Sequence, residues 1–125
     1  MNTQKLPKLE NLPQRNRWTH RATAQYLRSS RNTVKLYAEQ IAPAIRDFYD
    51  DCPKDERGFI SSGFSFSQYQ FWVIVKLISY ARLLKADLNG AAYRDDLKKA
   101  IGANQRYLSK ASYQYEIEMA EQQSA

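Results

Sequence analysis

Three polar side chains that can read base edges in duplex DNA directly follow a serine suited to capping a helix. The segment SRNTVK, residues 30–35, places Arg31, Asn32 and Lys35 after Ser30. Arginine can pair with guanine and asparagine with adenine through two hydrogen bonds, whereas lysine also reaches backbone phosphates. Serine at such a position satisfies a free N–H group of the first helical turn. We expect Ser30 to start a helix that presents the other three residues to DNA.

Neighbouring residues suit contacts with phosphates or with the helix itself. Arg21 and Arg28 precede the segment, and each can neutralise a phosphate. Thr33 and Ser30 either donate to the DNA backbone or only cap the helix, and for Ser30 we favour capping. Trp18 either braces the preceding helix or lies near DNA.

Residues with catalytic or metal-binding chemistry are sparse. The chain has one histidine, His20, and one cysteine, Cys52, which is too far from it in sequence to suggest a nucleophile–base pair. The acidic segment DDCPKDE lacks the spacing and central glycine of a calcium loop, and the four glycines form no phosphate-binding loop. We predict neither an enzyme nor a cofactor or metal site.

Short helices must position the DNA-reading residues. Thr19 is expected to cap a helix over 20–27, and Arg28 with Ser29 leaves room only for a tight turn before the next helix. That second helix has an apolar face at helical spacing, made of Val34, Tyr37, Ala38 and Ile41. Two short helices joined by a tight turn form a helix-turn-helix.

The middle of the chain adds a short helix, a hairpin and a long helix. Pro43 suits the first turn of a helix in which Ile45, Phe48 and Tyr49 share a face. The segment FISSGFSF, residues 59–66, predicts a β-hairpin around Ser-Ser-Gly. A capping box then starts the long helix, whose apolar positions and aromatic neighbours form the core. The residues concerned are Ser67, Gln70, Phe71, Trp72, Ile74, Val75, Ile78, Tyr80 and Leu84.

Two interpretations remain open for the C-terminal part. Either a helix over 91–101 stops at Gly102 and a terminal helix follows, or one helix continues through Gly102 at a cost of about 1 kcal/mol. The continuous helix would carry a coiled-coil seam of Leu97, Ile101, Asn104, Leu108, Ala111 and Tyr115. In both cases Leu108, Ala111 and Tyr115 share a face, which either pairs with a second copy or folds back onto the long helix.

The net charge of +6 lies entirely in the first third of the chain. Residues 1–40 hold eight bases and two acids, whereas residues 41–125 hold eleven of each sign. This asymmetry indicates a polyanion-binding end, although a solvated basic face is an alternative. Residues 1–16, with two prolines and no periodicity, predict a flexible arm whose bases continue to Arg17. No apolar segment is long enough for a leader or a membrane span, so a soluble cytoplasmic protein is expected.

The order of helix, turn, helix, hairpin and capped helix resembles the MerR family of winged helix-turn-helix transcription regulators. The match is densest in TAQYLRSSRNTVKLYAE, and GFSFSQYQFWVIVKLI and DLNGAAYRDDLKKAI look like the wing end with the third helix and the fourth helix. The family's pattern is matched by Ala24, Leu27, Ser30, Arg31, Asn32, Thr33, Val34, Lys35 and Tyr37. The resemblance covers about residues 18–101. The sequence departs from the family at Ser65, where the wing usually carries a basic residue that can contact a phosphate. In this chain Arg57 would have to supply such a contact.

The resemblance implies a mostly α fold with three parts, namely a basic arm over 1–16, a winged helix-turn-helix domain over 17–101 and a dimerisation helix with a polar tail over 102–125. The expected DNA contacts are Arg17, Trp18, Arg21, Arg28, Ser30, Arg31, Asn32, Thr33, Lys35 and Arg57. The expected dimer contacts are Leu108, Ala111 and Tyr115.

The expected function is that of a dimeric, nucleoid-associated repressor bound to double-stranded DNA. No effector domain follows the terminal helix and no paired cysteines accompany it, so no small-molecule effector is expected. Regulators of this kind occur with mobile elements, including CRISPR-associated transposons. Two alternatives stay open. One is a helical protein–protein adaptor that uses the acidic loop and terminal helix, and the other is an excision or recombination accessory factor that bends DNA.

Overall fold

Helices make up most of the chain that the computed structural model describes, which is residues 12–83, 99, 101 and 105–124. Within these ranges no strand forms, and β pairing is limited to two isolated bridges, Trp18 with Phe66 and Lys54 with Ile60. The protein is therefore mostly α, as the sequence predicts. The elements are α1 (His20–Leu27), α2 (Arg31–Leu36), the π-helix η1 (Tyr37–Ile41), the 3-10 helix η2 (Ala42–Ala44), α3 (Arg46–Asp51), α4 (Gln68–Leu83), the 3-10 helix η3 (Gln105–Leu108) and α6 (Lys110–Ser124).

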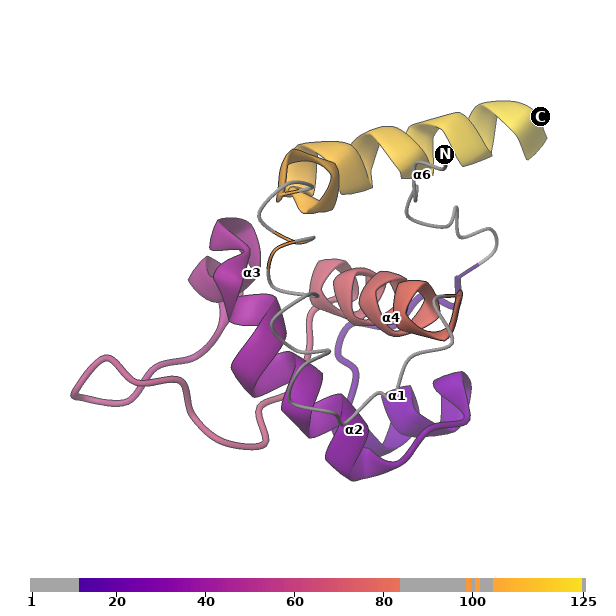
Figure 1. The fold of residues 1–125 in the computed structure, drawn as a ribbon. Coiled ribbons are helices and arrows are strands. Elements are labelled where there is room, and N and C mark those ends of the chain that lie inside the picture. Colours follow the sequence, from indigo (N-terminus) through magenta and orange to yellow (C-terminus); the bar gives the residue numbers. More distant parts are fainter. Residues whose placement is uncertain (1–11, 84–98, 100, 102–104, 125) are drawn as a thin grey trace.

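The centre of the fold is α4, which lies between α6 on one side and the α1–α2–η1 layer on the other (Figure 1). Every residue from Tyr69 to Ile78 is buried, as expected for a helix covered on all sides. The predicted capping box is confirmed, because the Ser67 N–H donates to Gln70 Oε1 at 3.0 Å and the Gln70 N–H donates to Ser67 Oγ at 3.1 Å.

A polar clasp holds α6 against α4. Trp72 Nε1 donates to Glu116 Oε2 at 2.6 Å, and Lys76 Nζ lies 3.1 Å from the same carboxylate. Tyr113 packs edge-on against Tyr69 and Trp72, with ring centroids 5.7 and 5.4 Å apart. The terminal helix thus folds back onto the long helix, which is one of the two arrangements that the sequence leaves open.

Carboxylates on α3 fix the beginning of α6. The Lys110 N–H donates to Asp47 Oδ2 at 2.9 Å, and Lys110 Nζ pairs with Asp51 Oδ1 at 2.5 Å. Phe48 of the same helix is buried as predicted, but Tyr49 is not. Tyr49 lies at the surface, with the Lys54 ammonium 4.3 Å from the centroid of its ring. The buried face of this segment therefore contains Ile45 and Phe48 but lacks Tyr49, which the sequence had predicted to lie on it.

The hairpin predicted over 59–66 is wrong for the part of the chain that the structure describes. The two halves of the segment do not pair with each other. Ile60 forms a bridge with Lys54, which precedes the segment, and Phe66 exchanges backbone hydrogen bonds of 2.8 and 2.7 Å with Trp18. Phe64 and Phe66 are both buried in the core. Burial of these two rings outweighs the local preference for a hairpin, because strand propensity mainly reflects the packing of side chains.

The predicted common face of Leu108, Ala111 and Tyr115 is also wrong. Leu108 ends η3 and is fully buried, and its C=O accepts a hydrogen bond of 2.5 Å from the Tyr69 hydroxyl. Ala111 and Tyr115 lie exposed on α6. The two helices differ because Ser109 starts a new one, with its Oγ accepting from the Ser112 N–H at 3.2 Å.

Several predictions fall outside the described residues. They concern the arm over 1–11, the position of Leu84, most of the helix over 91–101, and the continuity of the chain through Gly102. Lys99 and Ile101 are helical, and Ile101 is buried in the same core as Leu108.

Candidate nucleic-acid interface

A tight turn sets α2 against α1. Thr19 Oγ1 accepts from the Ala22 N–H at 3.0 Å, so α1 begins and ends where the sequence predicts. Arg28 closes it in the left-handed conformation, with φ 54° and ψ 46°. The Arg28 C=O accepts from Arg82 at the far end of α4, at 3.3 Å. The turn is therefore fixed both locally and by the central helix.

The start of α2 follows the capping prediction. Ser30 Oγ accepts from the Thr33 N–H at 3.1 Å and lies 2.9 Å from Thr33 Oγ1. Thr33 is buried, so its hydroxyl serves the cap, and the expected contact of Thr33 with DNA is wrong. Ser30 stays exposed at the surface.

The two faces of α2 and its continuation η1 differ sharply. Arg31, Asn32 and Lys35 are exposed. The opposite face is fully buried and consists of Val34, Tyr37, Ala38 and Ile41. A helix held this firmly on its apolar side presents its polar side chains from a rigid backbone, which precise recognition requires.

The basic side chains around α2 form no ion pairs with the Asp and Glu side chains that the structure describes. Arg17, Arg21 and Arg28 are exposed, and the ion pairs of the described residues all lie elsewhere, within 46–116. The nearest described acid in sequence, Glu39, accepts a hydrogen bond of 3.0 Å from the Gly63 N–H. The exposed charge of this layer therefore remains available to an anionic partner.

Trp18 belongs to the core and not to the surface. It is 1 % exposed and stacks on Phe71 of α4, with ring centroids 3.6 Å apart and an interplanar angle of 1°. Its Nε1 donates to Gln68 Oε1 at 2.8 Å. Of its two predicted roles, bracing is confirmed and the contact with DNA is wrong, because the ring is enclosed.

The end of the arm is anchored by a residue that the sequence did not suggest. Gln68 Nε2 donates to the Pro13 C=O at 2.8 Å, and Gln68 Oε1 also accepts from the Arg15 N–H at 3.1 Å. The Arg15 guanidinium lies 4.5 Å above the Trp18 ring. No local signal could have identified Gln68, because its partners are more than 50 residues away.

His20 is a second residue that sequence reasoning underrated. It is partly buried, stacks on Phe66 at 4.8 Å and lies edge-on to Phe64 at 6.1 Å. Burial lowers the pKa of His20, and the nearby charges of Lys35 and Arg31 lower it further, against opposing effects of Glu39 and the Phe64 backbone. A mainly neutral imidazole therefore lies close to Arg31 and Lys35 of α2.

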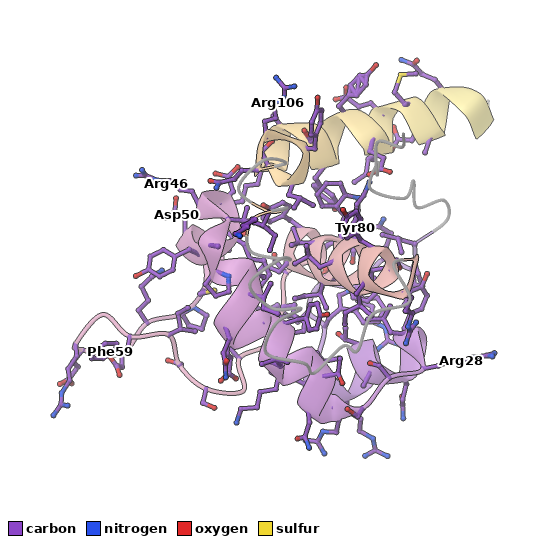
Figure 2. The ribbon with its side chains drawn as sticks, in the orientation of Figure 1. Arg28, Arg46, Asp50, Phe59, Tyr80 and Arg106 are labelled. Atoms are coloured by element: carbon purple, nitrogen blue, oxygen red, sulfur yellow. The ribbon has the colours of Figure 1, made fainter. Side chains whose placement is uncertain are left out.

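Arg57 is exposed in the loop over residues 53–61, which Figure 2 shows reaching away from the helices with Phe59 near its end. The hairpin predicted over 59–66, directly after this residue, does not form. Its N–H donates to Asp55 Oδ1 at 2.9 Å, so the backbone under its side chain is fixed.

Other chemistry has little support in the described residues. They contain no group of three histidine, cysteine or acidic side chains arranged for a metal ion. Cys52 is buried, and burial raises the pKa of its thiol to about 11, so it is a poor nucleophile at neutral pH. None of the described helices combines the length and the apolar character needed to cross a membrane.

Comparisons with protein-family models, with curated proteins and with solved structures found no match to this chain. The candidate interface therefore stands on its own geometry. Its core is Arg31, Asn32 and Lys35 on a firmly packed helix, flanked by exposed arginines.

Proposed function

We propose that this protein is a sequence-specific regulator that binds double-stranded DNA through the helix-turn-helix of α1 and α2. The observation that carries the proposal is the exposed face of α2, where Arg31, Asn32 and Lys35 project from a helix buried on its other side. Recognition helices of this motif enter the major groove and contact base edges with their N-terminal residues. Arg31 and Asn32 stand in the first turn and read bases, and Lys35 reads a base or a phosphate.

The surrounding arginines supply affinity without sequence preference. Arg17, Arg21 and Arg28 flank α2 without partners among the described acids, which suits them to phosphates on either side of the groove. Each phosphate neutralised contributes about −0.9 to the slope of log K against log salt. Binding is therefore expected to weaken steeply with salt.

The proposal includes a dimer formed by the exposed face of α6. The exposed apolar residues of α6 on this side follow at intervals of four, and they are Ala111, Tyr115 and Met119. The basic residue Arg106 stands just before α6, and the exposed acids Glu118 and Glu121 stand near its end, whereas Lys110 is already paired with Asp51. Two copies in antiparallel orientation would bring opposite charges together, which commits this face to a second copy of the chain. Leu108 takes no part because it is buried.

A dimer of this kind acts as a repressor of MerR-like type, in line with the order of its N-terminal helices. Its two recognition helices would read two half-sites related by a two-fold axis. The bound dimer would repress by blocking other proteins from the same DNA, and it would need no small-molecule effector to do so.

The test is selection of bound duplexes from a random pool, followed by mobility-shift titration of the selected duplex. Arg31→Ala should lose about tenfold or more in discrimination at one base pair, because a bidentate contact is worth about 1 to 3 kcal/mol. The matched control is Arg46→Ala, an arginine whose side chain is 86 % exposed on α3, away from Arg28 in Figure 2. The control should bind as the wild type does. Absence of any shift with random duplex at low salt would refute the proposal.

The adaptor alternative is separated by a heparin column. The adaptor, whose basic layer would bind no polyanion, should elute from the column at low salt. The DNA-binding protein should elute only at a higher salt concentration.

A further inference from the structure

Phe59 is the most exposed large apolar side chain among the described residues, at 65 %. It lies in the loop over residues 53–61, which we call the projecting loop. In Figure 2 the projecting loop extends from the body of the molecule, and Phe59 is near its outer end. A single exposed apolar residue is ordinary in itself. Phe59 is unusual because its backbone is held rigidly by hydrogen bonds.

The tip of the projecting loop is hydrogen-bonded to itself. The Asp55 N–H donates to the Phe59 C=O at 2.8 Å, and the Gly58 N–H donates to the Asp55 C=O at 2.9 Å. Asp55 Oδ1 accepts from the N–H groups of both Arg57 and Phe59, at 2.9 and 3.0 Å. Gly58 has φ +85°, which closes the turn in a conformation that suits glycine. The Phe59 backbone is therefore preorganised.

The base of the projecting loop is tied as well. Lys54 bridges to Ile60, and the Ser61 N–H donates to the Pro53 C=O at 2.9 Å. Lys54 Nζ donates to the carbonyls of Tyr49 and Cys52, at 2.8 and 3.0 Å. A loop fixed at both tip and base loses little conformational freedom when it inserts into a partner.

The chain just after the projecting loop is joined to η1, which continues α2. Arg31, Lys35 and Glu39 follow at intervals of four and so lie along one side of α2 and η1. Glu39 Oε2 accepts from the Gly63 N–H at 3.0 Å, which places the return of the loop at the end of this row. Gly63 is four positions after Phe59, so their Cα atoms are at most about 14 Å apart. The grooves of B-DNA are about 12 and 6 Å wide, so a side chain within this distance of Gly63 can reach a groove next to the one that α2 would enter.

We propose that Phe59 is a wedge that enters the minor groove beside α2 and inserts between two base pairs, kinking the duplex. This inference rests on the proposed function. Architectural DNA-binding proteins insert phenylalanine or aliphatic side chains between base steps and bend DNA by about 20 to 90°. Pyrimidine–purine steps unstack most easily, so the sites bound carry such a step beside each half-site.

The charged residues at the tip of the projecting loop do not favour binding to phosphates, so insertion of Phe59 is the better account of how the tip would bind DNA. The Asp55 carboxylate is occupied by two backbone N–H groups, whereas Glu56 is exposed and repels phosphates. Arg57 offsets that charge from the neighbouring position. Affinity gained at the tip therefore comes from stacking of Phe59, and Glu56→Gln should tighten binding.

The test uses the duplex selected from the random pool, labelled at both ends for energy transfer and carrying 2-aminopurine at the flanking steps. Wild-type protein should raise energy transfer and the fluorescence of 2-aminopurine at one step per half-site. Phe59→Ala should abolish both signals and weaken binding about tenfold, in line with the loss of one stacked base. Phe59→Leu should keep most of the bend, since leucine also serves as a wedge.

Arg46→Ala, which shortens a side chain that is 86 % exposed on α3, is the control and should leave bending unchanged. Far-UV circular dichroism of each variant establishes that it is folded. If Phe59→Ala binds and bends the selected duplex as the wild type does, the wedge is overturned and the proposed function stands. If the wild type selects no duplex, both are overturned. Normal bending by Phe59→Ala with loss of a co-purifying protein would assign the projecting loop to protein docking and also overturn the wedge.

Discussion

The clasp between α4 and α6 yields a quantitative prediction about stability. Glu116 accepts from Trp72 Nε1 at 2.6 Å and pairs with Lys76 at 3.1 Å. The side chains of Lys76 and Glu116 are only 8 % and 22 % exposed. Glu116→Gln removes the negative charge, keeps an oxygen acceptor for Trp72 and leaves the Lys76 ammonium buried without its counter-charge.

The magnitude follows from what remains around Lys76. Removing one partner of a buried ion pair costs about 3 to 5 kcal/mol. The Lys76 ammonium also lies 4.9 Å from the centroid of the Trp72 ring, and this cation–π contact recovers about 1 kcal/mol. We therefore expect Glu116→Gln to lower the free energy of unfolding by about 2 to 4 kcal/mol.

The reverse change should be milder. Lys76→Met keeps the packing of the aliphatic stem, and Glu116 retains its hydrogen bond with Trp72 and some contact with water, so we expect a loss of about 1 kcal/mol. The double variant Lys76→Met/Glu116→Gln should be more stable than Glu116→Gln alone, because it contains no unpaired buried charge.

The assay is equilibrium unfolding in urea, followed by circular dichroism and by tryptophan fluorescence, with coincident transitions required. A coupling free energy of about 2 kcal/mol between the two positions is expected from the double-mutant cycle. Additive effects, or a loss below about 0.5 kcal/mol for Glu116→Gln, would refute the reasoning.

Further predictions concern the turn, the histidine and the cysteine. Arg28→Gly relieves a left-handed conformation at φ 54° and removes the proposed phosphate contact. The urea midpoint should therefore not fall, while the salt slope of DNA binding should drop by about 0.9; a lower midpoint would contradict strain at Arg28. Because the pKa of His20 is lower in the folded state than its ordinary value of 6.5, the unfolded state binds the proton more readily. Stability should therefore be greatest above pH 6.5 and fall as the pH drops through it, and His20→Gln, compared by urea titrations from pH 7.5 to 5, should lose this part of the dependence; identical profiles would count against the prediction. Buried Cys52, with a thiol pKa of about 11, should resist a disulfide reagent at pH 8 until urea unfolds the chain, and rapid labelling of the folded protein would argue against its burial.

Much of the candidate interface was predictable because the interactions that define it are local. Thr19 and Ser30 each cap the helix that follows through an N–H group three residues on. The apolar face that begins with Val34 repeats with the helical period, and all its members are buried. The exposed positions of Arg31, Asn32 and Lys35 then follow, since they are what is left of the same short helix.

The tertiary structure decided the positions whose partners are remote. Trp18 could brace a helix or face DNA until Phe71 and Gln68 of α4 enclosed it. Phe66 had the local pattern of a hairpin, yet it pairs with Trp18. Leu108 had the spacing of a face that either a second copy or the long helix could cover, and the fold buries it in the core.

The physical reason is the range over which each preference is set. Caps and helical periodicity depend on hydrogen bonds and side chains within about four residues, so the sequence alone specifies them. Whether an apolar ring such as that of Trp18 or Phe66 is buried depends on area removed from water by residues far along the chain, and only the assembled core determines that. For Phe59 the opposite holds, because local hydrogen bonds close its loop and the fold leaves its ring exposed.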